Sequence, residues 1–324
     1  MTGFEVLTMG RVGVDVYPLQ TGVGLEDVET FGKYLGGSAT NVAVAAARLG
    51  RRTALVTRVG DDPFGRFVHK ALRGYGVDDR FVTAVPGLPT PVTFCEIFPP
   101  DHFPLYFYRR PTAPDLQIRA AELAEGELAA AVSGSTVFWA TVTGLCQEPS
   151  RSSTLAALGA RPPGAITVLD LDFRPMFWPS AEAATPWVAR ALEHATVAVG
   201  NLDECEVAVG TRDPDRAARL LLERGVRLAI VKLGPDGVLA TDGSGRVCEP
   251  PVPVAVLNGL GAGDAFGGAL CHGLLSGWDT ARTIRFANAA GAIVAGRLAC
   301  SDAMPTVGEV ESMLVGSGGA ADVG

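Results

Sequence analysis

The residues best suited to chemistry lie in the segment GLGAGD, positions 259–264, where Asp264 follows glycines at alternate positions. Apolar residues at helical spacing come next, so we expect Gly261, Ala262 and Gly263 to begin a helix. The free N–H groups and partial positive charge at a helix N-terminus bind anions. A carboxylate beside them can accept the proton of an attacking hydroxyl, so the segment predicts phosphorylation of an alcohol. The alternative role for Asp264 is a helix cap.

Two expectations concern the surroundings of Asp264. Residues 252–257 are apolar and β-rich, so we expect a strand directly before the glycine turn. The positive end of the helix stabilises a carboxylate anion, so we expect Asp264 to be a weak base.

The spacing GxGxxxG near the C-terminus differs from the dinucleotide fingerprint GxGxxG of a first βαβ unit, and the P-loop pattern GxxxxGK[ST] does not occur in the sequence. Phosphate would therefore be bound by a different device.

The segment GGSATN, residues 36–41, has a similar design near the N-terminus. Gly36 and Gly37 allow a close approach of the backbone, and the polar residues up to Asn41 open a helix of small residues. A polyol could accept hydrogen bonds there from backbone N–H groups and from the Asn41 amide. The alternative is a glycine turn with an ordinary helix cap.

Two further segments end predicted strands with polar residues. Asn201 follows the strand-like TVAVG, and Glu204 lies three residues later, one turn into a helix. Open α/β sheets bind ligands at the carboxyl ends of their strands, where Glu204 could hold Mg²⁺ through water. Lys232 ends another strand before the glycine turn of VKLGPDG, which could line the phosphates and base of a nucleotide. The alternative for that segment is a tight hairpin turn.

Apolar β-rich segments alternate with helical patterns along the chain. We expect strands within residues 5–16, 53–60, 136–144, 166–173, 196–200 and 228–234. We expect helices near residues 40–49, 63–74, 120–132, 181–194 and 213–224, and from 264 to 299. The alternation predicts an α/β fold with three layers, in which helices cover both faces of a central, mostly parallel sheet. This domain would span residues 1–315, followed by a flexible tail over 316–324.

Two segments interrupt the alternation, at residues 11–35 and about 88–112. Both contain strand patterns with no helix between them, including PTPVTFCEIF and PLYFYRR. Alternating apolar and polar residues predict a small antiparallel sheet with one exposed face. That sheet would be either a lid over a site or an extension of the main sheet at its edge.

Composition limits the class of protein. The chain has 324 residues, 48% of them hydrophobic, with 27 basic and 35 acidic side chains, which suits a compact enzyme and argues against nucleic-acid or membrane-surface partners. The six cysteines show no CxxC spacing, so we expect buried free thiols in a reducing cytosol. No signal peptide or apolar segment of 18 residues is evident, so we expect a cytoplasmic protein.

Together these segments resemble the ribokinase-like family of sugar kinases, also called the PfkB carbohydrate kinases. GGSATNVAVAAARLG resembles the N-terminal signature of that family and GLGAGDAFGGAL its C-terminal signature, while NLDE and KLGPDG lie between them in the family's order. The match extends from about residue 5 to 305. The resemblance implies an ATP-dependent kinase with a three-layer α/β/α domain and a β-sheet lid, which in relatives often also forms the contact of a homodimer.

The resemblance also implies a role for each matching residue. Asp264 would be the catalytic base, and the N–H groups of Gly261, Ala262 and Gly263 would stabilise the transferring phosphoryl group. The hydroxyls of the substrate would be bound by Asp15, Gly36, Gly37 and Asn41. Mg²⁺ and the phosphates of ATP would be bound through Asn201 and Glu204. The rest of the ATP site would be lined by Lys232, Gly234, Gly237 and Asn288.

Asn258 departs from the family's pattern. Many members have an aspartate six residues before the base, where it helps to bind an activating monovalent cation. The neutral amide of Asn258 offers one carbonyl oxygen and no charge, so the resemblance does not extend to activation by K⁺. The implied cofactors are ATP and Mg²⁺.

Two arginines bear on the identity of the sugar. Arg174 follows a predicted strand, and either Arg109 or its neighbour Arg110 would lie at the lid. Guanidinium groups pair with carboxylates through two hydrogen bonds, so converging arginines favour a sugar acid; the alternative for each is a structural ion pair. Segments such as FPLYFYR, PTAPDL and LDLDFRPMFW resemble a subfamily, the 5-dehydro-2-deoxygluconokinases of inositol catabolism. Asp172 favours that subfamily over the 2-keto-3-deoxygluconate kinases.

The expected activity is therefore transfer of the γ-phosphoryl group of ATP to the terminal hydroxyl of 5-dehydro-2-deoxy-D-gluconate. Alternatives in the same class are a 2-keto-3-deoxygluconate kinase and a fructokinase or ribokinase. From other classes, a sugar-sensing relative without catalysis and a nicotinamide-binding reductase remain. The intact Asp264 and its glycine turn oppose the sensor, because a sensor has no need of a base.

Overall fold

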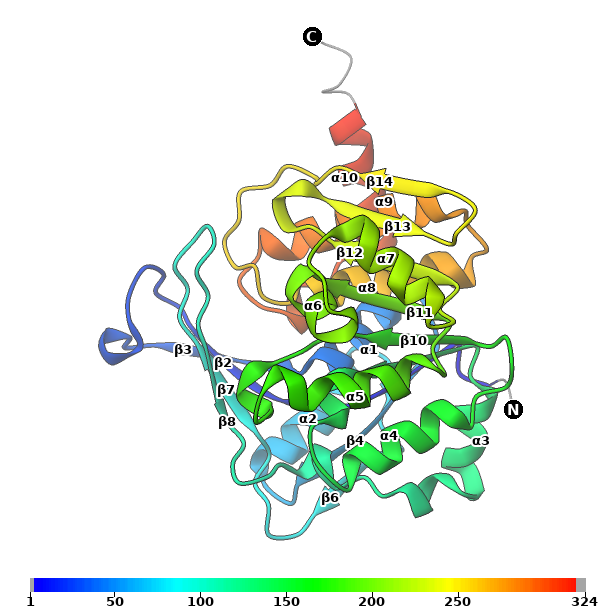
Figure 1. Cartoon of the computed structure of the whole chain (residues 1–324). Helices are drawn as coiled ribbons and strands as arrows, with labels where there is room; N and C mark the ends of the chain where they lie inside the picture. Colours follow the sequence, from blue (N-terminus) through cyan, green and yellow to red (C-terminus); the bar gives the residue numbers. More distant parts are fainter. Residues whose placement is uncertain (1–2, 319–324) are drawn as a thin grey trace.

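The computed structural model describes residues 3–318, and its main feature is a sheet of ten strands. The strands follow the order β14-β13-β12-β11-β10-β9-β1-β4-β5, with β6 paired to β4 (Figure 1). Their bounds are β1 (Val6–Met9), β4 (Thr53–Gly60), β5 (Val77–Asp78), β6 (Val82–Val85), β9 (Val137–Thr141), β10 (Ile166–Asp170), β11 (Val197–Asn201), β12 (Leu228–Lys232), β13 (Val238–Thr241) and β14 (Arg246–Glu249). All pairs are parallel except β12–β13 and β13–β14.

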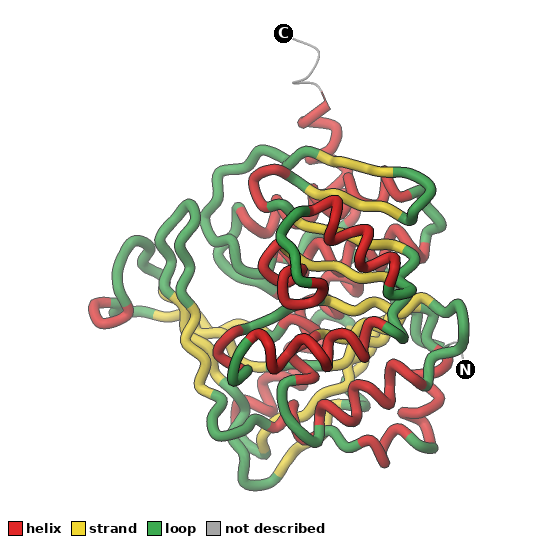
Figure 2. Tube along the Cα trace, viewed as in Figure 1, coloured by secondary structure: helices red, strands yellow, loops and turns green. Residues whose placement is uncertain are grey.

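Helices cover both faces of this sheet, as Figure 2 shows by the strands lying between two helical layers. One layer contains α1 (Ser38–Arg48), α2 (Pro63–Gly74), α8 (Ala262–Leu275), α9 (Thr280–Ala295) and α10 (Val307–Gly318). The other contains α3 (Gly126–Gly134), α4 (Ser150–Gly159), α5 (Ala181–Leu192), α6 (Leu202–Val209) and α7 (Pro214–Glu223). Neighbouring strand residues such as Val6 and Leu7 enter opposite cores, because side chains alternate along a strand. The predicted three-layer α/β fold is confirmed.

A second sheet of four strands stands beside the main body, at the left in Figure 1. Its order is β3 (Phe31–Gly36), β2 (Gly13–Pro18), β7 (Val92–Cys95) and β8 (Leu105–Tyr108). It is a sheet of its own, so the prediction of an edge extension is wrong. The prediction of an antiparallel sheet is wrong at one pair, since β2 and β7 run parallel. These two strands come from distant parts of the chain, so no hairpin imposes their direction.

Several predicted elements have different bounds. Residues 5–16 form two strands in different sheets, and residues 264–299 form two helices separated by a turn at Gly277, with φ of +65°. Residues 252–257 contain no strand; prolines at 250, 251 and 253 lack the N–H that a sheet requires. Within 120–132, the α-helix starts only at Gly126. Helix α4 was not predicted, because its small and polar residues give little helical periodicity.

The C-terminal helix extends into the predicted flexible tail. Helix α10 continues to Gly318, so residues 316–318 of the predicted tail are helical, and residues 319–324 lie outside the described part. All six cysteines are free, as predicted, although Cys146 is half-buried and Cys248 is exposed. Among residues 3–318 no helix is both long and apolar enough to span a bilayer.

Candidate active site

The first turn of α8 lies between two cavities. Gly261 precedes it with φ of +82°, a left-handed conformation that favours glycine, and a Cβ there would lie 2.7 Å from Sγ of Cys300. Gly261 and Asp264 line a small cavity, whereas Ala262 and Gly263 line a larger one. The predicted anion-binding turn therefore separates two spaces and contributes backbone or side chain to each.

The small cavity has a volume of about 60 Å³ and unites most of the predicted substrate residues. Its lining includes Asp15, Gly37, Asn41, Arg174, Gly261 and Asp264. Thr93, Leu105 and Phe107, on strands β7 and β8 of the second sheet, close it from the other side. The second sheet thus covers the predicted substrate site.

Gly36 and Gly37 bring α1 close to strand β2. A Cβ on Gly36 would lie 2.2 Å from the carboxyl of Asp15, and one on Gly37 would lie 2.4 Å from the backbone oxygen of Arg11. Real Cβ atoms do not approach so closely, so any side chain would push these elements apart. The diglycine was predicted to allow a close approach, and its nearest neighbours in the structure are residues of this chain.

Asp264 is the last member of a chain of hydrogen bonds. Ser301 donates its hydroxyl to Oδ1 of Asn41 at 2.7 Å, and Nδ2 of Asn41 donates to Oδ2 of Asp264 at 2.8 Å. The Ser301 bond orients the amide so that its NH₂ group faces the carboxylate. Burial raises the pKa of Asp264 to about 6, even though the Asn41 bond lowers it. The prediction of a weak base is therefore wrong, because desolvation outweighs the helix terminus.

Asp15 is a second carboxyl in the small cavity. The hydroxyl of Tyr17 donates a hydrogen bond to its Oδ2 at 2.9 Å. Burial raises the pKa of Asp15 to about 6, and the nearby Asp264 contributes in the same direction. A carboxyl in this position can accept hydrogen bonds from substrate hydroxyls.

The larger cavity has a volume of about 660 Å³ and unites four of the six predicted nucleotide residues. Lys232, Gly234, Gly237 and Asn288 line it together with Ala262 and Gly263. Residues 233–237 are also the turn between the antiparallel strands β12 and β13, so the hairpin alternative for VKLGPDG is confirmed, and its nucleotide role stays a prediction. Nδ2 of Asn288 donates to the backbone oxygen of Pro250 at 3.0 Å, which fixes that side chain at the rim.

Lys232 faces acidic side chains at the carboxyl ends of the strands. Burial lowers its pKa, but the carboxyls of Glu204 and Asp170 outweigh burial and raise it. Burial also raises the pKa of Asp170 to about 8, against the attraction of Lys232. A Cβ on Gly263 would lie 3.3 Å from Nζ of Lys232. The lysine is therefore charged and lies next to the first turn of α8.

Asn201 and Glu204 form a capping box at the start of α6. Oδ1 of Asn201 accepts from the N–H of Glu204 at 2.9 Å, and Oε2 of Glu204 accepts from the N–H of Asn201 at 2.8 Å. Both therefore have a structural role that the sequence analysis did not consider. Neither is among the residues that line the two cavities. Oε1 of Glu204 faces Nη1 of Arg174 at 3.6 Å.

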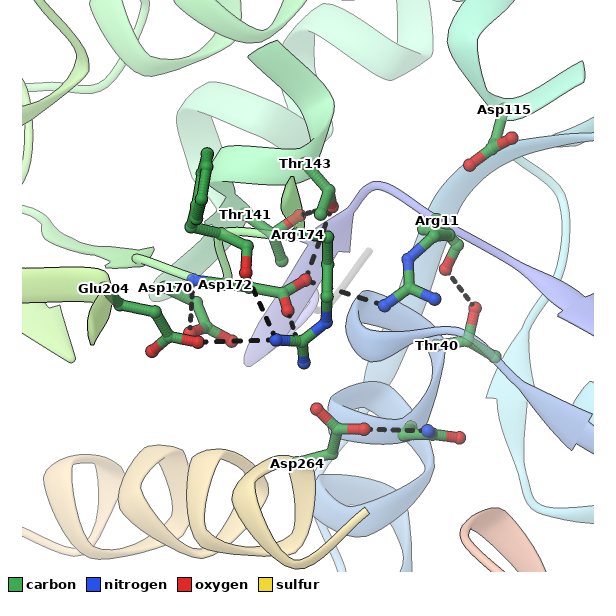
Figure 3. Close-up of polar contacts among 12 residues, drawn as sticks. Arg11, Thr40, Asp115, Thr141, Thr143, Asp170, Asp172, Arg174, Glu204 and Asp264 are labelled. Atoms are coloured by element: carbon green, nitrogen blue, oxygen red, sulfur yellow. Dashed lines mark hydrogen bonds and ion pairs between the residues drawn. The ribbon is translucent and has the colours of Figure 1, made fainter. Parts of the chain in front are cut away.

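Two arginines that line the small cavity, Arg11 and Arg174, meet at the buried carboxylate of Asp172. Oδ1 of Asp172 forms an ion pair with Nη2 of Arg174 at 2.8 Å, and its Oδ2 lies 3.6 Å from Nη2 of Arg11. Figure 3 shows Asp172 between the two guanidinium groups, with Asp264 nearby on α8. The sequence analysis named Arg174 and missed Arg11. A charged residue between two apolar strands, just before Asp15, was the available signal.

Arg109 and Arg110 do not line this cavity. Arg109 is buried in an ion pair with Asp115 at 2.9 Å, and its guanidinium lies 4.8 Å from the ring centre of Phe177. Arg110 is exposed and donates to the backbone oxygen of Met176. Both line a separate outer cavity of about 1060 Å³. In this structure neither arginine therefore faces the small cavity, and Asp115 is the partner of Arg109.

The sequence pattern of the pfkB family carbohydrate kinases matches residues 4–307. The chain belongs to this family. A 5-dehydro-2-deoxygluconokinase from Shouchella clausii is 31% identical over 316 residues, which are 96% of this chain and 95% of the relative. One from Clostridium tetani is 32% identical over 323 residues, covering 96% and 92% of the two chains. The protein is thus a carbohydrate kinase, and the small cavity is the candidate sugar site.

Solved structures of fructokinases share the fold of this carbohydrate kinase. A fructokinase from Xylella fastidiosa with bound ATP superposes with a TM-score of 0.82 at 26% identity, covering 97% of this chain and 99% of the other. A fructokinase from Vibrio cholerae, in its fructose, ADP and calcium ion bound form, gives a TM-score of 0.82 at 25% identity, with 96% and 99% covered. The predicted ribokinase-like architecture is confirmed.

Proposed function

We propose that this carbohydrate kinase transfers the γ-phosphoryl group of ATP to the terminal hydroxyl of 5-dehydro-2-deoxy-D-gluconate. The observation that carries the proposal is the position of the first turn of α8 between two cavities. One cavity contains the carboxyl of Asp264, and the other is lined by the glycine turn and by Lys232. A sugar in the first and a nucleotide in the second would meet at that turn.

The residues of the turn and of the two cavities have separate roles in the proposed reaction. Asp264 takes the proton of the attacking hydroxyl, and its raised pKa brings it closer to the operating pH. The N–H groups of Gly261, Ala262 and Gly263 stabilise the charge on the transferring phosphoryl group. Asp15 and Asn41 bind substrate hydroxyls, and Gly36 and Gly37 let the backbone approach closely enough to place both side chains at the cavity. Lys232 neutralises the phosphates as a charged donor.

Mg²⁺ would neutralise the charge of the nucleotide's phosphates. Among residues 3–318, no three His, Cys, Asp or Glu side chains form a group that could hold a metal ion. This fits Mg²⁺, which usually keeps several waters and binds through substrate phosphates with only one or two carboxylates. Glu204 would hold it through water, since its Oε2 already caps α6. Asn201 keeps that carboxylate in place, and Gly234, Gly237 and Asn288 line the space for the base and ribose.

The acid substrate is supported by charge and by relatives. Arg174 contributes a cation to the small cavity, and the relatives from Shouchella clausii and Clostridium tetani bear the name 5-dehydro-2-deoxygluconokinase.

The small cavity has a volume of about 60 Å³, which holds roughly two water molecules, so a six-carbon acid requires the second sheet to move outward. The sheet would therefore act as a lid.

The experiment that tests the proposal is a side-by-side kinetic panel. ADP release is measured with 5-dehydro-2-deoxygluconate, 2-keto-3-deoxygluconate, fructose and ribose at fixed ATP. We expect the highest kcat/KM with the first acid. A higher value with 2-keto-3-deoxygluconate, or with fructose or ribose, would replace the substrate and keep the kinase. Sugar binding without any ADP release would support a non-catalytic sensor instead.

We also propose that the enzyme is a homodimer joined through the second sheet. Thr93 and Phe107 point into the cavity, so alternation along their strands turns Phe94, Tyr106 and Tyr108 to the opposite face. Tyr108 and Tyr106 are 68% and 43% exposed, and Phe94 contacts the rings of both Phe31 and Tyr108. We call Phe31, Phe94, Tyr106 and Tyr108 the aromatic face. Exposed aromatic clusters of this kind are typical of protein interfaces.

A further inference from the structure

Arg11 is an arginine in the small cavity whose hydrogen-bonding capacity is largely unused. Its side chain is 11% exposed, and its only ion pair among the described residues is the one with Asp172 at 3.6 Å. Its Nε is buried and has no hydrogen-bond partner in the described chain. A buried donor without a partner is costly, so such a group at a binding site indicates an acceptor that the ligand brings.

Arg174, which pairs with the same Asp172 carboxylate, also leaves hydrogen-bonding capacity unused. Its Nε is also buried without a partner within residues 3–318, and its Nη2 forms an ion pair with Oδ1 of Asp172 at 2.8 Å. Both arginines line the small cavity. Asp172, which is buried, carries one negative charge between two positive ones (Figure 3). Arg174 also pairs with Glu204 at 3.6 Å, so the two arginines lack acceptors for their Nε–H groups rather than negative charge. The carboxylate of a ligand would offer such acceptors.

Aromatic rings hold Arg11 in place. Its guanidinium lies 5.3 Å from the ring centre of Phe107 and 5.8 Å from that of Phe177, and these two rings pack edge to face at 5.0 Å. Phe107 belongs to strand β8 of the second sheet, so that sheet, where it covers the cavity, completes the surroundings of Arg11. A fixed guanidinium in apolar surroundings is well suited to pair with a carboxylate through two hydrogen bonds.

We propose that Arg11 binds the carboxylate of the sugar acid jointly with Arg174, and that Asp172 positions both guanidinium groups. This inference rests on the proposed function, because it names a specificity-determining residue for the same substrate. It explains how the kinase would select an acid over a neutral sugar: without the carboxylate, the two Nε–H groups would stay buried and unpaired.

The test compares 5-dehydro-2-deoxygluconate with the same sugar whose carboxylate is reduced to a primary alcohol. Binding of each is measured by calorimetry without nucleotide, and the acid-to-alcohol affinity ratio is calculated. We expect Arg11→Lys, which keeps the charge but loses the planar fork, to lower this ratio about tenfold or more. The matched control Arg110→Lys, at an exposed arginine outside the cavity, leaves the ratio unchanged.

A second variant avoids dependence on a substitution that could disturb folding. Phe107→Leu keeps Arg11 and removes one ring from its guanidinium, so the ratio should fall about two- to fivefold. Thermal unfolding of each variant shows whether the fold is intact. The proposal fails if Phe107→Leu leaves the acid-to-alcohol ratio unchanged. It also fails if the folded Arg11→Lys variant binds the acid and the alcohol more weakly by the same factor. In either case Arg11 is only a structural partner of Asp172.

Turnover distinguishes this failure from failure of the proposed function. A wild-type enzyme that phosphorylates no sugar acid overturns the function itself, whatever the binding ratios. A wild-type enzyme that phosphorylates the acid, with an Arg11→Lys variant that keeps the wild-type ratio, overturns the role of Arg11 alone. If Arg11→Lys instead raises KM for ATP and not for the acid, Arg11 serves the phosphoryl group and the proposal is also wrong.

Discussion

Asn41 on α1 donates its side-chain amide to Asp264 on α8 at 2.8 Å, although 223 residues separate them in the chain. The bond joins the GGSATN segment to the GLGAGD segment, two glycine turns that lie far apart in the sequence. It holds the carboxyl at the mouth of the sugar cavity and lowers a pKa that burial raises. One side chain therefore both orients the proposed base and tunes its basicity.

Replacing the base is the most direct test of the mechanism. Asp264→Asn keeps the shape of the side chain but cannot accept the proton, so we expect kcat to fall about 10²- to 10⁴-fold. KM for ATP should change little, because the ATP cavity is lined by the neighbouring glycine turn. Steady-state kinetics and ATP titration by thermal shift would measure both. Turnover at the wild-type rate would remove Asp264 from the chemistry.

The pH profile should report the same carboxyl. Asp264 acts as a base only when it is deprotonated, and its pKa is about 6 because burial disfavours the charged form. We expect kcat/KM to rise with pH up to about 6 and then to level off. The Asn41 bond lowers this pKa, so Asn41→Leu should move the acid limb to higher pH. A limb that stays in place, or moves to lower pH, would contradict this account.

Arg174 should affect the sugar more than the nucleotide. Arg174→Ala removes a charge-assisted contact to the sugar acid. The variant should therefore stabilise the transition state less, by about 2 kcal/mol or more. KM for the keto acid should therefore rise far more than KM for ATP, as measured by varying each substrate at saturation of the other. Arg110→Lys is the control, since that side chain is exposed outside the sugar cavity. Equal effects on both substrates would exclude Arg174 from the sugar site.

Asn258 should make the enzyme independent of K⁺. Its Nδ2 donates to the backbone oxygen of Leu298 at 2.6 Å, and its Oδ1 accepts from the N–H of Leu260, so a neutral amide satisfies both neighbours. We expect equal rates in potassium chloride and choline chloride. Asn258→Asp sets a carboxylate against the Leu298 oxygen, so this variant should be more active with K⁺ than with choline. A wild-type rate that depends on K⁺ would refute the prediction.

The aromatic face should control the oligomeric state. Tyr108→Glu places a charge at its most exposed ring, so we expect the dimer to dissociate into monomers in light scattering after gel filtration. Val315→Glu is the matched control, because Val315 is an exposed apolar residue on α10, outside the second sheet. A wild-type protein that is already monomeric would disprove the proposed dimer. Dissociation of both variants would show that the effect is not specific to this face.

Elements with strong local signals were predicted closely. Strand β4 and helix α2 have the predicted bounds. Strand β4 is rich in β-branched residues and is buried along its whole length, and Asp62 with Pro63 starts α2 by a cap and a favourable first residue. The apolar segment 252–257 was misread as a strand. Hydrophobicity there reflects packing, since Val252 lies against the core of the helices α8 and α9 without joining a sheet.

By itself, the amino-acid sequence determined the alternation of strands and helices, the two glycine turns and the identity of the proposed base. These depend on residues near one another in the chain, whose periodicity and backbone freedom are local properties. Only the tertiary structure decided which arginine lines the small cavity beside Arg174. Arg109 has Asp115 six residues away as its partner, whereas Arg11 meets Asp172 and Phe107 from distant segments. A charge is available to a ligand only when its spatial neighbours leave it unpaired, and those neighbours are set by folding.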